Sequence, residues 1–437
     1  MDKKYDVIII GAGFAGVTAA RELCQAGFSV MILEGRDRIG GRTWLDDRFG
    51  SPLEMGGGWL HWYQPHVWSE IMRYGLQISS SPQVKTVYWQ ADGIIHHQSV
   101  EEWHQMMEKG MKAFLDGADR YFPFPYNPLK EMESLMEVDS ITAGQKLEQL
   151  MLPKELHELI YSIWCLQFSS SLEEVGLTQA HRLAALVNYD WKLVLRTSSA
   201  FKLKEGTKML IEHILHDAKR AHLRFSTTVS SVKKVKEGYI VSASDGSEVL
   251  GRAVVAAIPL NVLNKIAWMP PLSLKKQEAS TQKQNGKGFK FWAKVRGIKD
   301  PFIYIAPANH QVNYIQVEEI QDEVALIVGF GCDSVNFYPE MATNIGEEMQ
   351  TFLPQLEILE LAGHDWVSDP FSNGTWAVLK KNQLTKYLAE LQRNEDGVFL
   401  AGSDYASGWA GFIDGAIESG ITAGRKVSDY LLGNVNK

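Results

Sequence analysis

Cysteine is scarce in this sequence of 437 residues, which contains only Cys24, Cys165 and Cys332. No two of them have the spacing of metal ligands, and an odd number of distant cysteines does not suit a disulfide framework. We therefore expect free buried thiols, no bound metal ion and a reducing, cytoplasmic location.

Long apolar runs and excess positive charge are also missing. No segment reaches the roughly 18–20 apolar residues that a membrane span needs, and the run Val7–Ile10 is too short for the core of a secretory signal. The formal net charge is −8, which argues against a basic nucleic-acid-binding surface and suits the attraction of small cations. The sequence therefore predicts a protein that binds neither membranes nor nucleic acid.

Short β-branched runs and helical periodicity are present instead. They predict a strand over Tyr5–Ile10, a helix over Phe14–Gln25 and a strand over Phe28–Glu34, which together form a βαβ unit. Further elements are expected as helices over Glu101–Phe114, Ile141–Leu150, Glu155–Cys165 and 413–432, as a β-meander between 223 and 260, and as strands over Lys290–Val295, Val312–Val317, Val324–Phe330 and Val398–Leu400.

The turn inside the βαβ unit reads Gly11-Ala12-Gly13-Phe14-Ala15-Gly16, which is G-x-G-x-x-G. In a dinucleotide site the first glycine makes the tight turn, the second lets the backbone approach the pyrophosphate, and the third allows close packing of helix and strand. Glu34 ends the second strand, where a carboxylate can accept hydrogen bonds from a ribose diol. A purely structural glycine-rich turn is the alternative, but the placement of all three features favours a nucleotide.

The segment from Glu34 to Thr43 separates FAD from NAD. It reads E-G-R-D-R-I-G-G-R-T and adds Arg36, Gly41 and Arg42 to the site. A second glycine-rich turn with arginines supplies N–H donors and cations for a further stretch of pyrophosphate and ribityl chain. An NAD enzyme does not need such a turn, so the sequence predicts FAD.

With these motifs the sequence resembles the flavin monoamine oxidase family, which includes polyamine oxidases and bacterial nicotine-type oxidases. The resemblance spans nearly the whole chain, and its pattern is most similar to that of the bacterial 6-hydroxynicotine oxidases. Besides the N-terminal motifs it rests on E-M-G-G-G-W-L-H at 54–61, Lys290, D-W-V-S-D-P-F-S-N-G-T-W at 365–376, A-G-S-D at 401–404 and G-W-A-G-F-I-D-G-A-I-E at 408–418.

The resemblance implies an α/β fold in which a discontinuous Rossmann-like FAD-binding domain is interleaved with a mixed α+β substrate domain, as in amine oxidases and p-hydroxybenzoate hydroxylase. Cofactor-type segments lie at the beginning, middle and end of the chain. We therefore place the FAD-binding domain in 1–75, 215–285 and 385–437, and the substrate-binding domain with its helical subdomain in 76–214 and 286–384.

The resemblance also implies which residues hold the cofactor. Val229 matches the family's adenine contact, Asp404 its ribityl or pyrophosphate contact, and the helix that begins at Ile413 can direct its N-terminus at the flavin. The remaining predicted cofactor residues are Gly57, Gly58, Trp59, Trp366, Ser403 and Phe412.

Four residues match the catalytic face of the family. Trp376 and Phe412 match the aromatic cage around the amine, which departs from the paired tyrosines of the mitochondrial enzymes. Lys290 matches the lysine that holds a water near flavin N5, and His61 a position near the active site of polyamine oxidases. The alternatives are core aromatics, a solvent-facing lysine and an ordinary core histidine. Thr375 stands where the mitochondrial enzymes have a flavin-linked cysteine, so we predict non-covalent FAD.

The predicted reaction is the oxidation of an amine with O2 to an imine, which hydrolyses, and H2O2. The alternatives are a desaturase or porphyrinogen-type oxidase of the same superfamily, which acts on C–C bonds, and a flavin-binding regulatory protein without turnover. No carboxylate-binding arginine is assigned to the substrate pocket, although Arg196 and Arg296 are conceivable. The predicted partners are therefore a small amine and O2, and the question whether two chains form a homodimer is left open.

Overall fold

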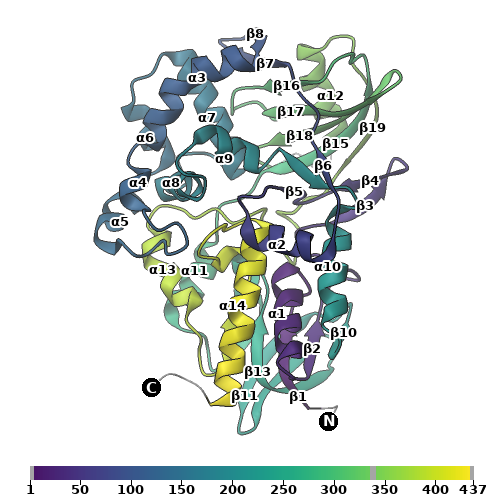
Figure 1. Cartoon of the computed structure of the whole chain (residues 1–437), viewed down its shortest axis with the longest axis vertical. Coiled ribbons are helices and arrows are strands. Elements are labelled where there is room, and N and C mark those ends of the chain that lie inside the picture. Colours follow the sequence, from purple (N-terminus) through teal and green to yellow (C-terminus); the bar gives the residue numbers. More distant parts are fainter. Residues whose placement is uncertain (1–3, 335–340, 434–437) are drawn as a thin grey trace.

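The computed structural model describes residues 4–334 and 341–433 of the chain. Figure 1 shows an elongated molecule whose lower part is built on one large sheet and whose upper part is built on a second sheet. The first and the last of the described residues both lie in the lower part. The cavity described below lies between these two parts.

The lower sheet has eight strands in the order β10-β2-β1-β13-β12-β11-β14, with β20 paired to β13. Parallel pairing joins β10 to β2, β2 to β1, and β1 to β13. The bounds are β1 Tyr5–Ile10, β2 Val30–Leu33, β10 Ala221–Arg224, β11 Val229–Val235, β12 Gly238–Ala243, β13 Glu248–Ala256, β14 Ala267–Met269 and β20 Val398–Leu400. The predicted βαβ unit, meander and final strand are confirmed.

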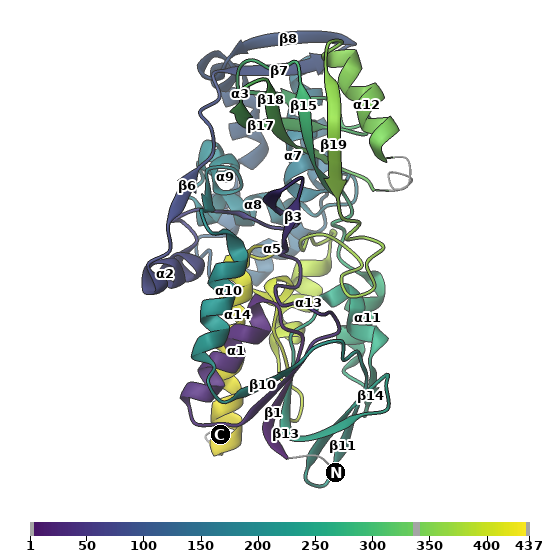
Figure 2. The same cartoon turned by 90° about the vertical axis from the view of Figure 1, so that its right-hand side faces the viewer.

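Two helices pack side by side on one face of this sheet, α1 (Phe14–Gln25) and α14 (Ile413–Leu432), and both have the predicted bounds (Figures 1 and 2). They approach closely because α14 presents glycines to α1. A Cβ on Gly420 would lie 2.5 Å from the carbonyl oxygen of Ala15, and one on Gly424 would lie 2.7 Å from Cβ of Glu22. The helices α2 (Pro65–Tyr74) and α10 (Gly206–Asp217) flank this pair.

The upper sheet has seven strands in the order β19-β15-β18-β17-β16-β7-β8. Its strands come from distant parts of the chain: β7 Thr86–Ala91, β8 Ile94–Ser99, β15 Phe289–Arg296, β16 Phe302–Ile305, β17 Tyr314–Gln321, β18 Val324–Gly331 and β19 Glu357–Gly363. The predicted strands at 290–295 and 324–330 are confirmed, and the one at 312–317 is displaced toward the C-terminus. The helix α12 (Met341–Phe352) covers one face of this sheet with Ile345, Met349 and Phe352.

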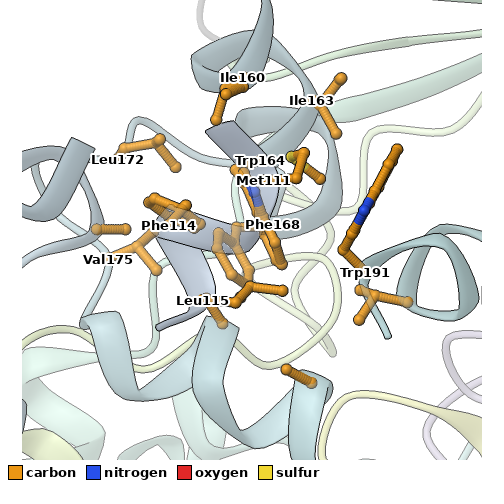
Figure 3. Packing of buried hydrophobic residues seen from close by; sticks show 14 of the residues in the cluster. Met111, Phe114, Leu115, Ile160, Ile163, Trp164, Phe168, Leu172, Val175 and Trp191 are labelled. Carbon is orange, nitrogen blue, oxygen red and sulfur yellow. The ribbon is translucent and has the colours of Figure 1, made fainter. Parts of the chain in front are cut away.

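The other side of the upper part is helical. Figure 3 shows its core, where Trp164 lies between Phe114 and Phe168 with ring centroids 5.1 and 5.3 Å away. The helices are α3 Val100–Leu115, α4 Ala118–Tyr121, α5 Met132–Asp139, α6 Ala143–Gln149, α7 Lys154–Phe168, α8 Leu177–Leu186 and α9 Trp191–Thr197. The predicted helices correspond to α3, α6 and α7, whereas α4, α5, α8 and α9 were not predicted.

Short elements connect the two parts. They are β3 Leu45–Arg48 with β4 Ser51–Glu54, the small sheet of β5 Trp59–Leu60, β9 Phe201–Leu203 and β6 Ile78–Ser80, and the helices η1 Leu260–Lys265, α11 Leu274–Gln282, α13 Gln383–Gln392 and η2 Ser403–Tyr405. Within residues 4–334 and 341–433, no helix has both the length and the apolar character needed to cross a bilayer. The predicted domain boundaries remain a proposal.

Candidate functional site

A cavity of about 800 Å³ runs from the C-terminal ends of β1 and β2 to the strands of the upper sheet. It brings together most of the residues predicted from sequence. Those on its wall are Gly11, Gly13, Ala15, Glu34, Arg36, Gly41, Arg42, Gly57, Gly58, Trp59, Val229, Lys290, Trp366, Trp376, Ser403, Phe412 and Ile413. Gly16, His61 and Asp404 do not line it.

The glycines of the first turn divide into two kinds. Gly11 has φ +101°, and a Cβ on Gly16 would lie 2.1 Å from the carbonyl oxygen of Gly11, so the fold itself requires both. Gly13 has an ordinary φ of −76°, and a Cβ there would come no closer than 3.8 Å to any atom that it would meet. No side chain caps α1, so its first N–H groups are left without a side-chain acceptor at the cavity wall. The arrangement fits a bound phosphate.

Glu34 is buried beside this turn. Its carboxylate accepts hydrogen bonds from the backbone N–H of Ala12 at 2.7 Å and of Arg36 at 2.9 Å. A carboxylate has about four acceptor positions, so two remain for a ligand. Val229 lines the same end of the cavity. The pair suits a ribose and an adenine.

The two arginines of the loop tie distant segments to the cavity wall. Arg36 donates to Asp369 at 2.6 Å and to Ser372 at 3.1 Å. Burial alone would raise the pKa of Asp369, but hydrogen bonds from His364 and Arg36 hold it well below its usual range. The wall at this point is therefore charged and fixed before any ligand binds.

Arg42 connects two further segments, those of Thr375 and of Ser403, to the cavity wall. It donates to the carbonyl oxygen of Thr375 at 2.8 Å and to Oγ of Ser403 at 3.0 Å, and it pairs with Asp404. The other oxygen of Asp404 accepts from the N–H of Leu260 at 2.9 Å. Asp404 thus lies behind Arg42, and its direct contact with a cofactor stays a prediction.

The N-terminus of α14 opens on the cavity at Phe412 and Ile413. No side chain caps it, because the acidic residue of the first turn, Asp414, points away. Asp414 accepts instead from the N–H of Val67 at 2.9 Å and from His66 at 3.1 Å. The free N–H groups and the positive end of the helix dipole therefore favour negative charge at this point of the cavity.

Lys290 is buried on β15, so the solvent-facing alternative is wrong. Its Nζ donates to the carbonyl oxygens of Glu54 at 2.5 Å and Gly56 at 2.9 Å and lies 4.6 Å from the ring centroid of Trp59. Burial lowers the pKa of Lys290 to about 7, although the Glu54 carboxylate opposes the shift. When the amine is neutral, its two N–H groups serve the two carbonyls and its lone pair stays free.

Trp376 and Phe412 lie on adjoining segments of the wall. The indole N–H of Trp376 donates to the carbonyl oxygen of Gln167 at 3.1 Å, which fixes the plane of the ring. Phe412 packs edge-to-face on Trp409 with ring centroids 5.0 Å apart. Gly411 joins the segments, since a Cβ there would lie 3.5 Å from Cβ of Trp376. Both rings are partly exposed and held by the protein.

His61 is fully buried outside the cavity wall, among Trp62, Tyr63 and Phe201. Its Nδ1 accepts from the N–H of Tyr63 at 3.3 Å. Burial, with the charge of Arg196, lowers the pKa of His61 to about 4. The geometry therefore gives it no contact with the site, and its catalytic role stays a prediction.

Sequence reasoning missed the side chains of the upper half of the cavity. From the sheet come Val87, Phe289, Ile303, Ile305, Tyr314, Gln316 and Phe330, and from the helices Trp103, His104, Ile163 and Leu195. Of the two arginines named as conceivable in the substrate pocket, Arg196 lines the cavity and Arg296 does not. A usable signal was the polar alternation of Tyr314, Gln316 and Glu318 within an apolar strand. Among the described residues that line the cavity, Glu34 is the only carboxylate.

Comparisons with known proteins agree with this geometry. A profile of the flavin-containing amine oxidoreductases matches residues 14–299 and 339–428. A pseudooxynicotine dehydrogenase of a Pseudomonas species is 34% identical over 98% of this chain and 87% of the relative. An (S)-6-hydroxynicotine oxidase of Paenarthrobacter nicotinovorans is 26% identical over 95% and 97%. A putrescine oxidase double mutant superposes with a TM-score of 0.84 at 21% identity over 97% and 99%, and this likeness confirms the predicted fold.

The two kinds of glycine predict two different mutant phenotypes. In Gly13→Ala the new Cβ meets no atom closer than 3.8 Å, so the cofactor-free protein should keep its melting temperature while its dissociation constant for FAD rises at least tenfold. In Gly16→Ala the Cβ meets backbone, so the cofactor-free protein should lose about 1–3 kcal/mol of stability. Thermal unfolding and FAD titration measure both effects, and tight FAD binding by Gly13→Ala would contradict the phosphate assignment.

The lowered pKa of Lys290 predicts a pH-dependent stability. Its pKa falls from 10.5 to about 7 on folding, so between these values the unfolded chain binds more protons and the stability rises with pH. Lys290→Met should remove this rise, and Lys299→Met, at an exposed position on a loop, should retain it. Urea unfolding of the cofactor-free proteins from pH 6.5 to 9.5 measures the slopes. Equal slopes in wild type and Lys290→Met would refute the shift.

Proposed function

Because this chain belongs to the flavin-containing amine oxidoreductases, it is a flavin-dependent enzyme that oxidises amines, and we propose that FAD lies along the cavity with its adenosine at Glu34 and Val229. Gly13 carries this proposal: it lies on the cavity wall, and a Cβ there would come no closer than 3.8 Å to its neighbours, so the fold itself does not require a glycine at this position. The N-terminus of α1 would hold the pyrophosphate, and Arg42 with Ser403 the ribityl chain.

The flavin ring would lie where α14 begins. When bound, FAD supplies the two-electron acceptor that takes a hydride from the carbon beside the amine nitrogen. The free N–H groups of α14 would stabilise negative charge at the pyrimidine edge of the ring. The indole of Trp376 and the ring of Phe412 would confine the amine and exclude bulk water. Lys290 in its neutral form would hold a water through its lone pair.

The site favours an aromatic monoamine over a polyamine. Its upper half is lined mainly by apolar and aromatic side chains, and no carboxylate of the described residues stands there to pair with a second ammonium group. The relatives are named for pseudooxynicotine and 6-hydroxynicotine. We therefore propose a nicotine-like substrate, in which an alkyl amine is attached to a ring.

The names of these two relatives imply different electron acceptors, since one is named a dehydrogenase and the other an oxidase. We propose O2 as the acceptor, with H2O2 as the product. Turnover measured in air by peroxide release, and without O2 by reduction of an artificial dye, separates the two functions. Fast turnover with the dye and little peroxide in air would favour a dehydrogenase.

The aromatic cage predicts a loss of amine oxidation in Trp376→Ala. A ring that faces an amine contributes about 1–2 kcal/mol, so kcat/KM should fall roughly 5- to 30-fold while the bound flavin is retained. A panel of primary, secondary, polyamine and nicotine-like amines, with flavin reduction as the readout, tests this and the substrate class together. Trp62→Ala, on an exposed position outside the cavity, is the control. Unchanged turnover of amines in Trp376→Ala would contradict the cage, whereas failure of every amine to reduce the flavin would favour C–C chemistry.

Non-covalent attachment of FAD gives a simple expected outcome. Thr375 replaces the cysteine that links flavin in the mitochondrial enzymes, and none of Cys24, Cys165 and Cys332 lines the cavity. Acid precipitation of the purified protein should therefore release all of the yellow colour into the supernatant. A yellow pellet that survives washing would show a covalent bond.

A further inference from the structure

Two charged side chains hold the last loop before α14 from opposite edges. Arg182 of α8 donates to the carbonyl oxygens of Ala406 at 3.2 Å and Ser407 at 3.1 Å. Glu418 of α14 accepts from the N–H groups of Ser407 at 2.9 Å and Gly408 at 3.0 Å. The C=O and N–H of a trans peptide point in opposite directions. Two successive peptide groups therefore lie between a guanidinium and a carboxylate, and we call this arrangement the peptide clamp.

The loop needs glycine at two positions to lie in the peptide clamp. A Cβ on Gly408 would lie 2.4 Å from the ring of Tyr126 and 2.9 Å from a carboxylate oxygen of Glu418. A Cβ on Gly415, in the first turn of α14, would lie 2.1 Å from the carbonyl oxygen of Trp409. The close approach of the loop to Glu418 is thus built into the backbone.

The peptide clamp places a charge in an apolar surrounding. Arg182 is 5% exposed, and within the described part of the chain it forms no direct ion pair. Burial lowers the pKa of Arg182 to about 10, although the charges of Glu418 and Asp139 oppose the shift, so the guanidinium stays charged at neutral pH. Its neighbours on α8 include Leu183 and Leu186. Because an apolar side chain often replaces a buried charge without loss of stability, stability alone does not account for an arginine here.

The position of the Phe412 ring depends on this loop. Phe412 and Trp376 line both the cavity of about 800 Å³ and a second cavity of about 20 Å³, which Arg182 also lines. The second cavity has room for about one water molecule, so packing on that side does not hold the ring. Phe412 packs instead on Trp409, whose ring centroid is 5.0 Å away and whose N–H donates to the carbonyl oxygen of Tyr63 at 2.9 Å. Trp409 directly follows the clamped peptides, so the clamp sets the place of both rings.

We propose that Arg182 and Glu418 are positioning residues for amine oxidation, which fix Phe412 against the amine by holding the peptide groups of 406–408. Neither side chain lines the larger cavity, so both act through the loop. The clamp then controls how the amine is oriented and how large its nitrogen substituents can be. This inference rests on the proposed function, because it assumes that an amine is oxidised between Trp376 and Phe412.

Arg182→Met tests this role, since it keeps a long side chain and removes the charge and the donors. In the holoenzyme kcat should fall about tenfold with little change in KM, because the rest of the cavity still binds the substrate while the amine is held less firmly. The preference for an N-methyl amine over the N-isopropyl amine of the same skeleton should narrow by a similar factor. Glu418→Gln should show both changes, and Arg182→Lys, which keeps the charge, should recover part of the loss.

The double variant Arg182→Met/Glu418→Gln tests whether the two side chains act together. Both hold the same two peptide groups, so the double variant should lose about as much of kcat as either single variant. Two unrelated effects would instead multiply.

Hydrogen exchange in the cofactor-free protein tests the peptide clamp without turnover. The N–H groups of Ser407 and Gly408 should exchange about tenfold faster in Arg182→Met, because the loop is then held from one edge only. Lys276→Met is the matched control: Lys276 is a buried cation on α11 that donates to a backbone carbonyl at 2.6 Å and to Glu395 at 2.7 Å, and it lines neither cavity. This control should leave the exchange at 407–408, kcat and the size preference unchanged.

The outcomes distinguish this inference from the function beneath it. Failure of every amine to reduce the flavin of the wild-type holoenzyme would overturn the proposed function and this inference with it. Unchanged exchange at 407–408, a lower melting temperature without a change in kcat or in size preference, or losses that multiply in the double variant would overturn the role of Arg182 and Glu418 alone. Where Arg182→Met does not fold, the milder Arg182→Lys and Glu418→Gln decide between the same outcomes.

Discussion

The close packing of α14 on α1 is the contact on which the rest of the site depends. Gly420 lies against Ala15 and Gly424 against Glu22, so the two helices run parallel and in a fixed register. The two contacts place residue 14, where α1 begins, level with residues 416 to 419 of α14. Because α14 begins at Ile413, its N-terminus extends roughly 5–9 Å beyond that of α1 at 1.5 Å per residue. In the proposed binding mode one helix start would therefore serve a phosphate and the other a group further along the same ligand.

The wall between these two helix starts is held by ion pairs that join distant segments. Arg36 reaches Asp369, and Arg42 reaches Asp404, across 333 and 362 positions of the chain. Buried arginines lose hydration, and their carboxylate partners repay part of that cost only when the geometry is fixed. The loop of residues 34–43 is thus ordered by the protein itself, so the cavity does not have to be organised by the ligand.

Local patterns predicted the parts of the site that local geometry controls. The first turn, Glu34 and α14 follow from glycine spacing, strand length and helical periodicity, and each has the expected bounds. His61 and Asp404 carried the right motifs but lie off the wall, because His61 packs among Trp62, Tyr63 and Phe201 and Asp404 pairs with Arg42. Tyr314 and Gln316 were missed because the polar alternation of their strand does not tell that β7, β16 and β17, which are about 200 residues apart in the chain, meet at the cavity. The helices α8 and α9 were missed for a similar reason, since their buried faces pack on tertiary partners.

The two halves of the cavity differ in charge, and this difference bears on the chemistry. The lower half presents helix N-termini and arginines, which favour a dianionic pyrophosphate. In the upper half the described lining has no carboxylate, and burial, with a smaller contribution from the charge of Lys202, lowers the pKa of Lys290. A charged ammonium group entering there would lose its hydration without gaining a counter-charge, and the ring faces of the cage would replace only part of that hydration. The protein thereby favours the neutral amine, which is the form that can give up a hydride.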